Sequence, residues 1–162
     1  MIHLEKVDHK NIWEIIKLKP LDSQLDFVAP NSESIMEAYI AVTSENSYAY
    51  PFGIYDDETL VGFLMIGYNE GAIEVDAPKS LNDNYTIWRF MIDKNYQKRG
   101  YGKESLMLAL EFIKTWPKGK ADYVVLSYEP ENEVARKLYA SLGFKETGEM
   151  DDDEIIAVLK LQ

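Results

Sequence analysis

The stretch Asp93-Lys94-Asn95-Tyr96-Gln97-Lys98-Arg99-Gly100-Tyr101-Gly102-Lys103 lies between a strand-like run and a helix-like run. Its two glycines let the backbone turn tightly and let a ligand come close to main-chain N–H groups. The first turn of a helix leaves N–H groups unpaired and carries a partial positive charge. The junction therefore predicts an anion site, best suited to phosphate or pyrophosphate. Four basic residues surround the glycines, in a chain whose formal net charge is −11: Lys94, Lys98, Arg99 and Lys103.

The loop differs from two well-known phosphate-binding loops. It lacks the Gly-x-x-x-x-Gly-Lys-Ser/Thr order of a P-loop. It also lacks the third glycine of the dinucleotide-binding fingerprint. A phosphorylated ligand is still expected, but ATP or NAD chemistry is not.

The elements on either side of this loop predict a parallel pair of strands. Residues 85–92 are nearly all strand-favouring and apolar, as in a central strand covered on both faces. Residues 102–116 have a helical apolar stripe, and residues 123–128 form a second apolar strand. Because a helix connects the two strands, they should run parallel.

Further strands and a further helix complete one α/β (α+β) domain over residues 1–162. Residues 48–55 and 60–68 predict an antiparallel hairpin, and residues 144–149 and 154–161 predict another. A weak strand is expected at 2–7, and an edge strand or loop at 72–75. A helix from Pro130 is expected to end at Gly143, with one apolar side. That side is formed by Val134, Ala135, Leu138, Tyr139 and Leu142.

The N-terminal third is expected to form a helical cover. Helical spacing predicts a helix over residues 12–19, with Asp8 as its N-cap and Pro20 ending it. A second helix should begin at Asn31 and bury an apolar stripe. The stripe consists of Ile35, Met36, Tyr39, Ile40 and Val42.

Composition narrows the functional class. Hydrophobic residues make up 46% and charged residues 28% of 162 residues, which is ordinary globular composition. No apolar run is long enough to span a membrane, and the first residues do not resemble a signal peptide. The absence of cysteine excludes thiolate zinc sites and a cysteine nucleophile, and fits a cytoplasmic protein. With only two histidines, no metal site is expected.

The acidic balance bears on the partners. A net charge of −11 argues against a general nucleic-acid-binding protein. It suits a small cationic substrate, and it equally suits a protein that is acidic for solubility.

Two side chains on the last predicted helix could take part in chemistry. Asn132 and Tyr139 are seven residues apart, so they lie on the same side of a helix. The Tyr139 hydroxyl can donate a proton or a hydrogen bond. The alternative is purely structural, with Asn132 as an N-cap and Tyr139 in the core.

Taken together, the two segments resemble the GNAT superfamily of N-acetyltransferases. The resemblance rests on Gln97-x-x-Gly100-x-Gly102 after a strand, followed by Asn132-x-x-Ala135-x-x-Leu138-Tyr139-x-x-x-Gly143-Phe144. It implies a mixed, mostly antiparallel sheet with a parallel central pair and helices on both faces. Within the superfamily, Trp88–Asp93, Tyr96–Gly102 and Leu60–Met65 resemble bacterial spermine/spermidine (diamine) acetyltransferases.

The resemblance also implies roles for individual residues. The loop would hold the pyrophosphate of acetyl-coenzyme A, and Met91 and Ile92 would pair through their main chains with the pantetheine arm, like an added strand. Asn132 would contact the arm near the sulfur, and Tyr139 would be the general acid that protonates the leaving thiolate. The N–H of Ile92 would stabilise the oxyanion. The loop residues are Gln97, Lys98, Arg99, Gly100, Tyr101, Gly102 and Lys103.

The general base is left open. Some relatives carry a glutamate near the position of Trp88, which this chain lacks. Glu74, Asp76 and Glu129 are candidates by polarity, each also fits a surface charge, and a chain of waters would serve as well.

The residues at the expected acceptor end have more than one interpretation. Arg89 is awkward for a cationic acceptor and could instead pair with an internal carboxylate. Tyr85, Trp88 and Tyr128 could wall the acceptor or belong to the core.

The leading hypothesis is direct acetyl transfer from acetyl-coenzyme A to a primary amine of spermine or spermidine. A second hypothesis keeps the reaction and changes the acceptor to a protein N-terminus, lysine, aminoglycoside or amino acid. A third is a non-catalytic acyl-coenzyme A-binding module. The family often forms dimers, so a homodimer is compatible with the resemblance.

Overall fold

The computed structural model describes all 162 residues and contains one seven-stranded sheet in the order β1-β2-β3-β4-β5-β7-β6. Only β4 and β5 run parallel, and all other neighbouring strands are antiparallel. The predicted mixed sheet with a parallel central pair is therefore confirmed. The strands are β1 (Ile2–Lys6), β2 (Tyr48–Asp56), β3 (Thr59–Tyr68), β4 (Tyr85–Ile92), β5 (Tyr123–Tyr128), β6 (Lys145–Asp151) and β7 (Glu154–Lys160).

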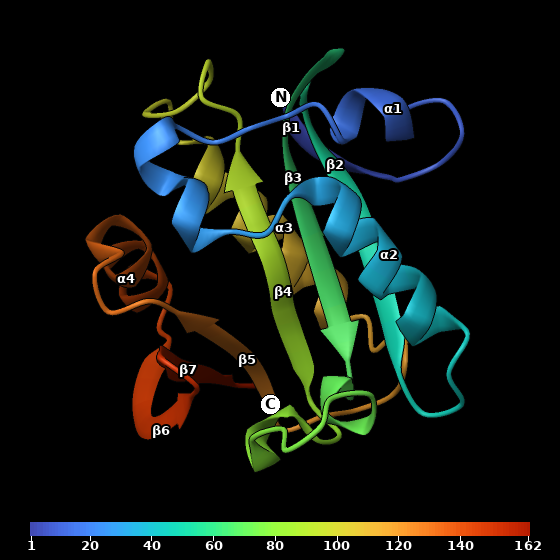
Figure 1. Cartoon of the computed structure of the whole chain (residues 1–162), viewed down its shortest axis with the longest axis vertical. Helices are drawn as coiled ribbons and strands as arrows, with labels where there is room; N and C mark the ends of the chain where they lie inside the picture. The colour runs from blue at the N-terminus through green and yellow to red at the C-terminus, as the bar shows by residue number, and fades with distance from the viewer.

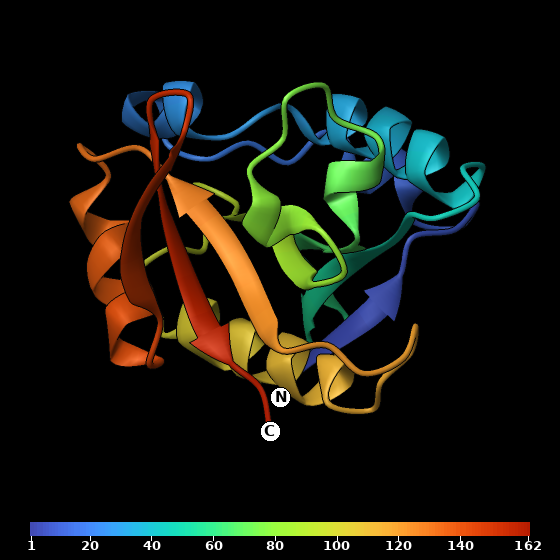
Figure 2. The ribbon, with the colours of Figure 1, turned by 90° about the horizontal axis from the view of Figure 1, so that it is seen from below.

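Helices cover both faces of the sheet, with α2 on one face and α3 on the other (Figures 1 and 2). None of these helices combines the length and the apolar character that crossing a membrane requires. The α-helices are α1 (Ile12–Ile15), α2 (Asn31–Val42), α3 (Tyr101–Ile113) and α4 (Glu133–Ser141). Short 3₁₀ segments are η1 (Asp22–Phe27), η2 (Glu70–Ala72) and η3 (Lys79–Leu81).

Helix α3 follows the prediction closely because its apolar residues recur at helical spacing. Leu106, Ala109 and Ile113 are buried against the sheet in the larger of the core clusters. Their removal from water stabilises the helix more than its intrinsic propensity does. The same cluster includes Val124 of β5 and Tyr139 of α4, so both halves of the sheet share this core.

The centre of the sheet opens between β4 and β5. The two strands pair only at Tyr85–Val124 and Thr86–Val125, and they then diverge, as Figure 1 shows. On the other side of β4, Met65 of β3 pairs with Arg89 while the next residue of β3 pairs with Ile87. Trp88 is therefore the extra residue of a β-bulge, which bends and twists the strand.

The first predicted helix is much shorter than expected. Residues 12–19 were expected to be helical after an Asp8 cap, but α1 ends at Ile15 and Asp8 is not its N-cap. Asn11 closes a turn instead, because its side chain accepts a bond from the Asp8 N–H (2.9 Å) and donates one to the Lys6 carbonyl (3.0 Å). The helix begins at Ile12 as predicted, and its C-terminal part is missing. The N–H groups of Lys17 and Leu18 donate to the Glu14 and Ile15 carbonyls (both 3.2 Å), three residues back, and that of Lys19 donates to Asp93 Oδ2 (3.1 Å).

The predicted apolar stripe of α2 is wrong. The helix buries small residues, Ser34, Ala38 and Ala41, which lie on one face at spacings of four and three. Small side chains let a helix lie close to a sheet, and they displace the larger residues from that face. Four predicted stripe residues are consequently exposed: Met36, Tyr39, Ile40 and Val42.

Residues 72–75 belong to η2 and the turn after it, so of the two predicted alternatives the loop is observed and the edge strand is not. One smaller prediction changes. Val134 was predicted on the buried side of α4, but it is 72% exposed.

Candidate active site

The glycine loop forms an open turn at the start of α3. Lys98 and Gly100 adopt left-handed backbone conformations, with φ of 61° and 83°, and the space around the Gly100 Cα is open. The first intrahelical bond runs from the Glu104 N–H to the Gly100 carbonyl (3.4 Å). The N–H groups of residues 101–103 precede this bond, so they are free to bind an anion.

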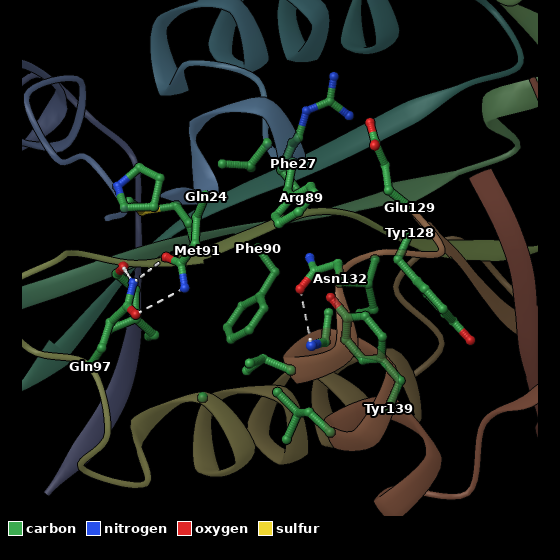
Figure 3. Close-up of a pocket in the computed structure, with 18 of the residues that line it drawn as sticks. Gln24, Phe27, Arg89, Phe90, Met91, Gln97, Tyr128, Glu129, Asn132 and Tyr139 are labelled. Atoms are coloured by element: carbon green, nitrogen blue, oxygen red, sulfur yellow. Dashed lines mark hydrogen bonds between the residues drawn. The ribbon is translucent and has the colours of Figure 1, made fainter. Parts of the chain in front are cut away.

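Side chains on both sides of the loop fix its shape. Asp93 is buried and accepts bonds from the main-chain N–H groups of Asn95 (3.0 Å) and Lys19 (3.1 Å). Gln97 donates to the Ile92 carbonyl (3.0 Å), and its side chain exchanges two bonds with Gln24 of η1 (2.7 and 3.2 Å; Figure 3). The loop is therefore anchored both to the end of β4 and to the segment that covers it.

The end of β4 offers a free main-chain edge. The Asp93 N–H donates to the Val61 carbonyl of β3 (2.8 Å). Successive residues of an antiparallel strand alternate in the direction of their polar groups. Met91 therefore directs its N–H and C=O toward β3, while those of Ile92 face the opening between β4 and β5, where the Ile92 carbonyl also accepts the bond from Gln97. Both residues line the same cavity.

Helix α4 brings Asn132 and Tyr139 to the other wall of this opening. Asn132 is the N-cap, because its Oδ1 accepts a bond from the Ala135 N–H (3.3 Å), and it also faces the cavity. Tyr139 is 8% exposed and packs against the rings of Tyr128 and Phe144. Figure 3 shows its hydroxyl turned toward Asn132 and the open space. Burial raises the pKa of Tyr139 far above its usual value, so the phenol stays protonated.

A cavity of about 530 Å³ joins these pieces and extends to a polar far end. It brings together all but two of the residues predicted to form the site. Those that line it are Met91, Ile92, Gln97, Lys98, Gly100, Tyr101, Gly102, Asn132 and Tyr139. The exceptions are Arg99, which donates to the Asn95 carbonyl (3.3 Å) and lies over the Tyr96 ring, and Lys103, which is exposed on α3.

Arg89 is neutralised within the protein. Its Nη2 lies 2.8 Å from Oε1 of Glu37 on α2, and its Nη1 donates to the Trp88 carbonyl (3.0 Å). Its Nε is buried without a partner. Desolvation raises the pKa of Glu37, and Arg89 opposes that rise. The internal ion pair considered as an alternative for Arg89 is therefore present, and it ties α2 to the bulge.

The structure separates the other predicted acceptor-side residues. Trp88 and Tyr128 line the cavity, whereas Tyr85 is fully buried and donates to the Gly119 carbonyl (2.7 Å), so it belongs to the core. Glu129 lines the cavity, but Glu74 and Asp76 do not.

Several polar residues in or near the cavity were missed: Gln24, Asp26, Glu37, Ser127 and Glu154. They belong to segments distant in sequence from the loop. No local pattern marks them.

A second polar cluster holds α4 in place. The Tyr128 hydroxyl donates to Glu146 Oε1 (2.8 Å), and Arg136 donates to both Glu146 oxygens (2.7 and 3.1 Å). These bonds connect the end of β5, helix α4 and strand β6. They position the helix that carries Tyr139.

The site as a whole suits a long, extended ligand with an anionic end. The free N–H groups of the loop can hold the anion, and the edge of Ile92 can pair with an amide-containing arm. Tyr139 lines the opposite wall, and its hydroxyl can donate a hydrogen bond or a proton. Such an arrangement is compatible with an acyl-thioester ligand of the coenzyme A type, and therefore with the class of acyltransferases.

Comparison with known proteins leads to the same class. The Acetyltransferase (GNAT) family matches residues 13–144. The chain is 32% identical over 152 residues to a probable spermine N(1)-acetyltransferase of Bacillus subtilis subsp. natto and to a spermine/spermidine N(1)-acetyltransferase of Bacillus subtilis. In both cases the match covers 93% of this chain and 91% of the relative. The chain therefore belongs to the GNAT family of acetyl-CoA-dependent N-acetyltransferases, as its sequence predicted.

Solved structures agree in fold. The PaiA N-acetyltransferase of Thermoplasma acidophilum, in complex with coenzyme A, superposes with a TM-score of 0.67 at 16% identity, over 99% of both chains. An aminoglycoside acetyltransferase, AAC(6')-Ib, in complex with coenzyme A and kanamycin, gives a TM-score of 0.77 at 14% identity, over 99% of this chain and 95% of the other.

Proposed function

We propose that this enzyme acetylates a primary amine of a polyamine such as spermidine or spermine. The observation that carries the proposal is the charge at the far end of the cavity. Glu129 and Glu154 line it, and Arg89, the one cation among the lining residues there, is paired with Glu37. An uncompensated pair of carboxylates attracts a flexible polycation. The names of the Bacillus relatives support the same acceptor class.

The proposal assigns the anchoring of acetyl-coenzyme A to one end of the cavity. Main-chain N–H groups from Lys98 to Gly102 hold the pyrophosphate, and Gln97 keeps the loop in shape. Arg99 and Lys103 flank the loop and add positive charge. Ile92 pairs with the pantetheine arm, because its polar main-chain groups face the opening, and Met91 supplies part of the apolar wall. When bound, acetyl-coenzyme A supplies the activated acetyl group.

The remaining residues act on the reacting end. The Ile92 N–H stabilises negative charge on the carbonyl oxygen. Asn132 orients the arm near the sulfur. Tyr139 gives its phenolic proton to the departing sulfur, a role that its place on the cavity wall allows.

The test is acetyl-coenzyme A consumption by the purified protein with a panel of amines. The panel contains spermidine, spermine, putrescine, kanamycin, free amino acids and peptides with free N-termini or lysines. The highest kcat/KM is expected for spermidine or spermine, with KM rising as salt screens the carboxylates. Turnover of peptides or kanamycin without turnover of polyamines would refute the polyamine as acceptor and identify the acceptor class instead. Tight binding of acetyl-coenzyme A with no turnover of any amine would refute the proposed acetyl transfer to these amines.

A further inference from the structure

Glu154 occupies a special place at the start of β7. Its neighbour Ile155 pairs with Tyr128, and Ile156 pairs with Ser127, so Glu154 stands beside the end of β5. The side chain lines the same cavity as Tyr139. Oε1 accepts a bond from the Ser127 hydroxyl (3.3 Å), which holds the carboxylate at the cavity wall.

Charged and titratable groups surround Glu154 from every adjoining element. They are Arg89 of β4, Glu129 after β5, Asp151 of β6 and Tyr139 of α4. Partial burial raises the pKa of Glu154 and the two nearby carboxylates raise it further, while the Ser127 bond and Arg89 oppose the rise. Glu154 in turn contributes to the raised pKa of Tyr139, which places the two groups in one electrostatic environment.

The reaction needs a group of this kind. A polyamine nitrogen is protonated at neutral pH and cannot attack a carbonyl until it loses a proton. Glu74 and Asp76 lie outside the cavity. Asp26 and Glu129 line it, but no hydrogen bond fixes either carboxylate, whereas Ser127 holds that of Glu154. Glu154 alone combines a place on the cavity wall, a tether and proximity to Tyr139.

We propose that Glu154 is the general base that takes the proton from the acceptor ammonium. This inference rests on the proposed acetyl transfer to an ammonium-bearing acceptor. Glu154 accepts one proton from nitrogen, and the freed lone pair forms the N–C bond to the acetyl carbon. As the C–S bond breaks, Tyr139 protonates the sulfur, and the second nitrogen proton restores the phenol. Glu154 then releases its proton to solvent.

The test compares Glu154→Gln with the wild-type enzyme on the best acceptor of the panel. We expect kcat/KM to fall by roughly 100-fold or more, the usual contribution of general base catalysis. The acidic limb of the pH–rate profile should disappear. Methoxyamine, whose nitrogen is already neutral at assay pH, should be acetylated at nearly the wild-type rate. Coenzyme A affinity and the melting temperature should stay close to wild type.

Two further variants make the result specific. Asp151→Asn, outside the cavity wall, should keep the acidic limb, and Glu154→Asp should recover part of the lost rate. An equal loss of rate with the ammonium acceptor and with methoxyamine would overturn the proposal in favour of a structural role. An unchanged acidic limb in Glu154→Gln would also overturn it. Wild-type turnover of a non-polyamine would leave this inference standing while refuting the polyamine acceptor.

Discussion

Tyr139 is the residue whose surroundings most clearly fit one task. Its ring is buried among aromatic neighbours, and the residue lines the cavity. The Tyr139 hydroxyl forms no hydrogen bond within the protein, so it is available to a bound ligand. A protonated phenol at this place can donate its proton to a leaving group, which is the role proposed above.

Tyr139→Phe should therefore reduce kcat by roughly 100-fold while the affinity for coenzyme A changes little. Phenylalanine fills the same space, so the core around Phe144 should remain packed. Steady-state kinetics and calorimetric titration with coenzyme A provide the two measurements. An unchanged kcat would remove Tyr139 from the role of acid.

The ion pair between Glu37 and Arg89 governs charge at the acceptor end. Glu37→Gln would leave the guanidinium uncompensated beside the bulge. We expect KM for spermidine to rise about tenfold, which corresponds to about 1.4 kcal/mol of repulsion, with kcat nearly unchanged. Kinetics with Glu33→Gln, an exposed carboxylate on the same helix, serve as the matched control.

The double variant Glu37→Gln, Arg89→Met sharpens this prediction. Removing both charges should restore KM toward the wild-type value, because the repulsive cation is gone. If KM for spermidine is as high in the double variant as in Glu37→Gln alone, Glu37 acts by positioning α2 and not through its charge.

At the scale of elements, the end of β4 at Met91 and Ile92 tolerates the least change in the neighbouring strand β3. Gly62 of β3 faces it, and a Cβ at this position would lie 2.5 Å from the Met91 carbonyl oxygen. That oxygen belongs to the backbone, so the strand itself would have to shift. The free edge of Ile92 would move with it.

Gly62→Ala should lower the free energy of unfolding by about 1–3 kcal/mol, as overpacking usually does. It should also weaken coenzyme A binding, because the pairing edge is displaced. Denaturant unfolding and coenzyme A titration are the measurements. Thr59→Ala, at the exposed start of the same strand, should change neither. Full coenzyme A affinity in Gly62→Ala would show that the edge does not depend on this contact.

Elements with local signals were predictable from the sequence, and elements shaped by distant partners were not. The stripe of α3 and the apolar runs of β4 and β5 already specify the cofactor end. In α2 the large apolar residues gave a wrong prediction of the buried face. The helix lies close to the sheet, so Ala38 and Ala41 are buried there, while Met36 and Tyr39 are exposed. The acceptor end depends on contacts such as Glu37 to Arg89, 52 residues apart, and Ser127 to Glu154, 27 residues apart, which no periodicity encodes.

At the scale of the whole molecule, acidic charge sets the response to pH. Glu70 is 7% exposed, and burial together with Glu74 raises its pKa well above the usual value. A carboxyl group whose pKa is higher in the folded than in the unfolded state favours folding more strongly when it is protonated. The free energy of unfolding should therefore increase as the pH falls through the raised folded-state pKa of Glu70 toward the ordinary glutamate value of about 4.3.

Glu70→Gln should flatten this increase and should stabilise the protein at pH 8, because the uncharged amide avoids burying a charge. Thermal melts between about pH 8 and 5 measure the effect, above the range where Asp56 and Glu146, whose pKa values are lowered by their partners, begin to be protonated. Glu58→Gln, in an exposed turn, is the control. If the melting temperature of Glu70→Gln changes with pH as in the wild type, other carboxylates cause the pH dependence of stability.

The sparse pairing of β4 with β5 coincides with a division of the chain. Strands β1 to β4 and helix α3 come from residues 1–113, and the remaining strands and α4 come from residues 123–160. A chain cut between residues 114 and 122 would yield two fragments that each keep a complete subsheet. Coenzyme A bound in the seam would contact both fragments, so it would promote their reassembly by mass action. The two fragments could therefore serve as a split biosensor, in which their reassembly reports the concentration of coenzyme A.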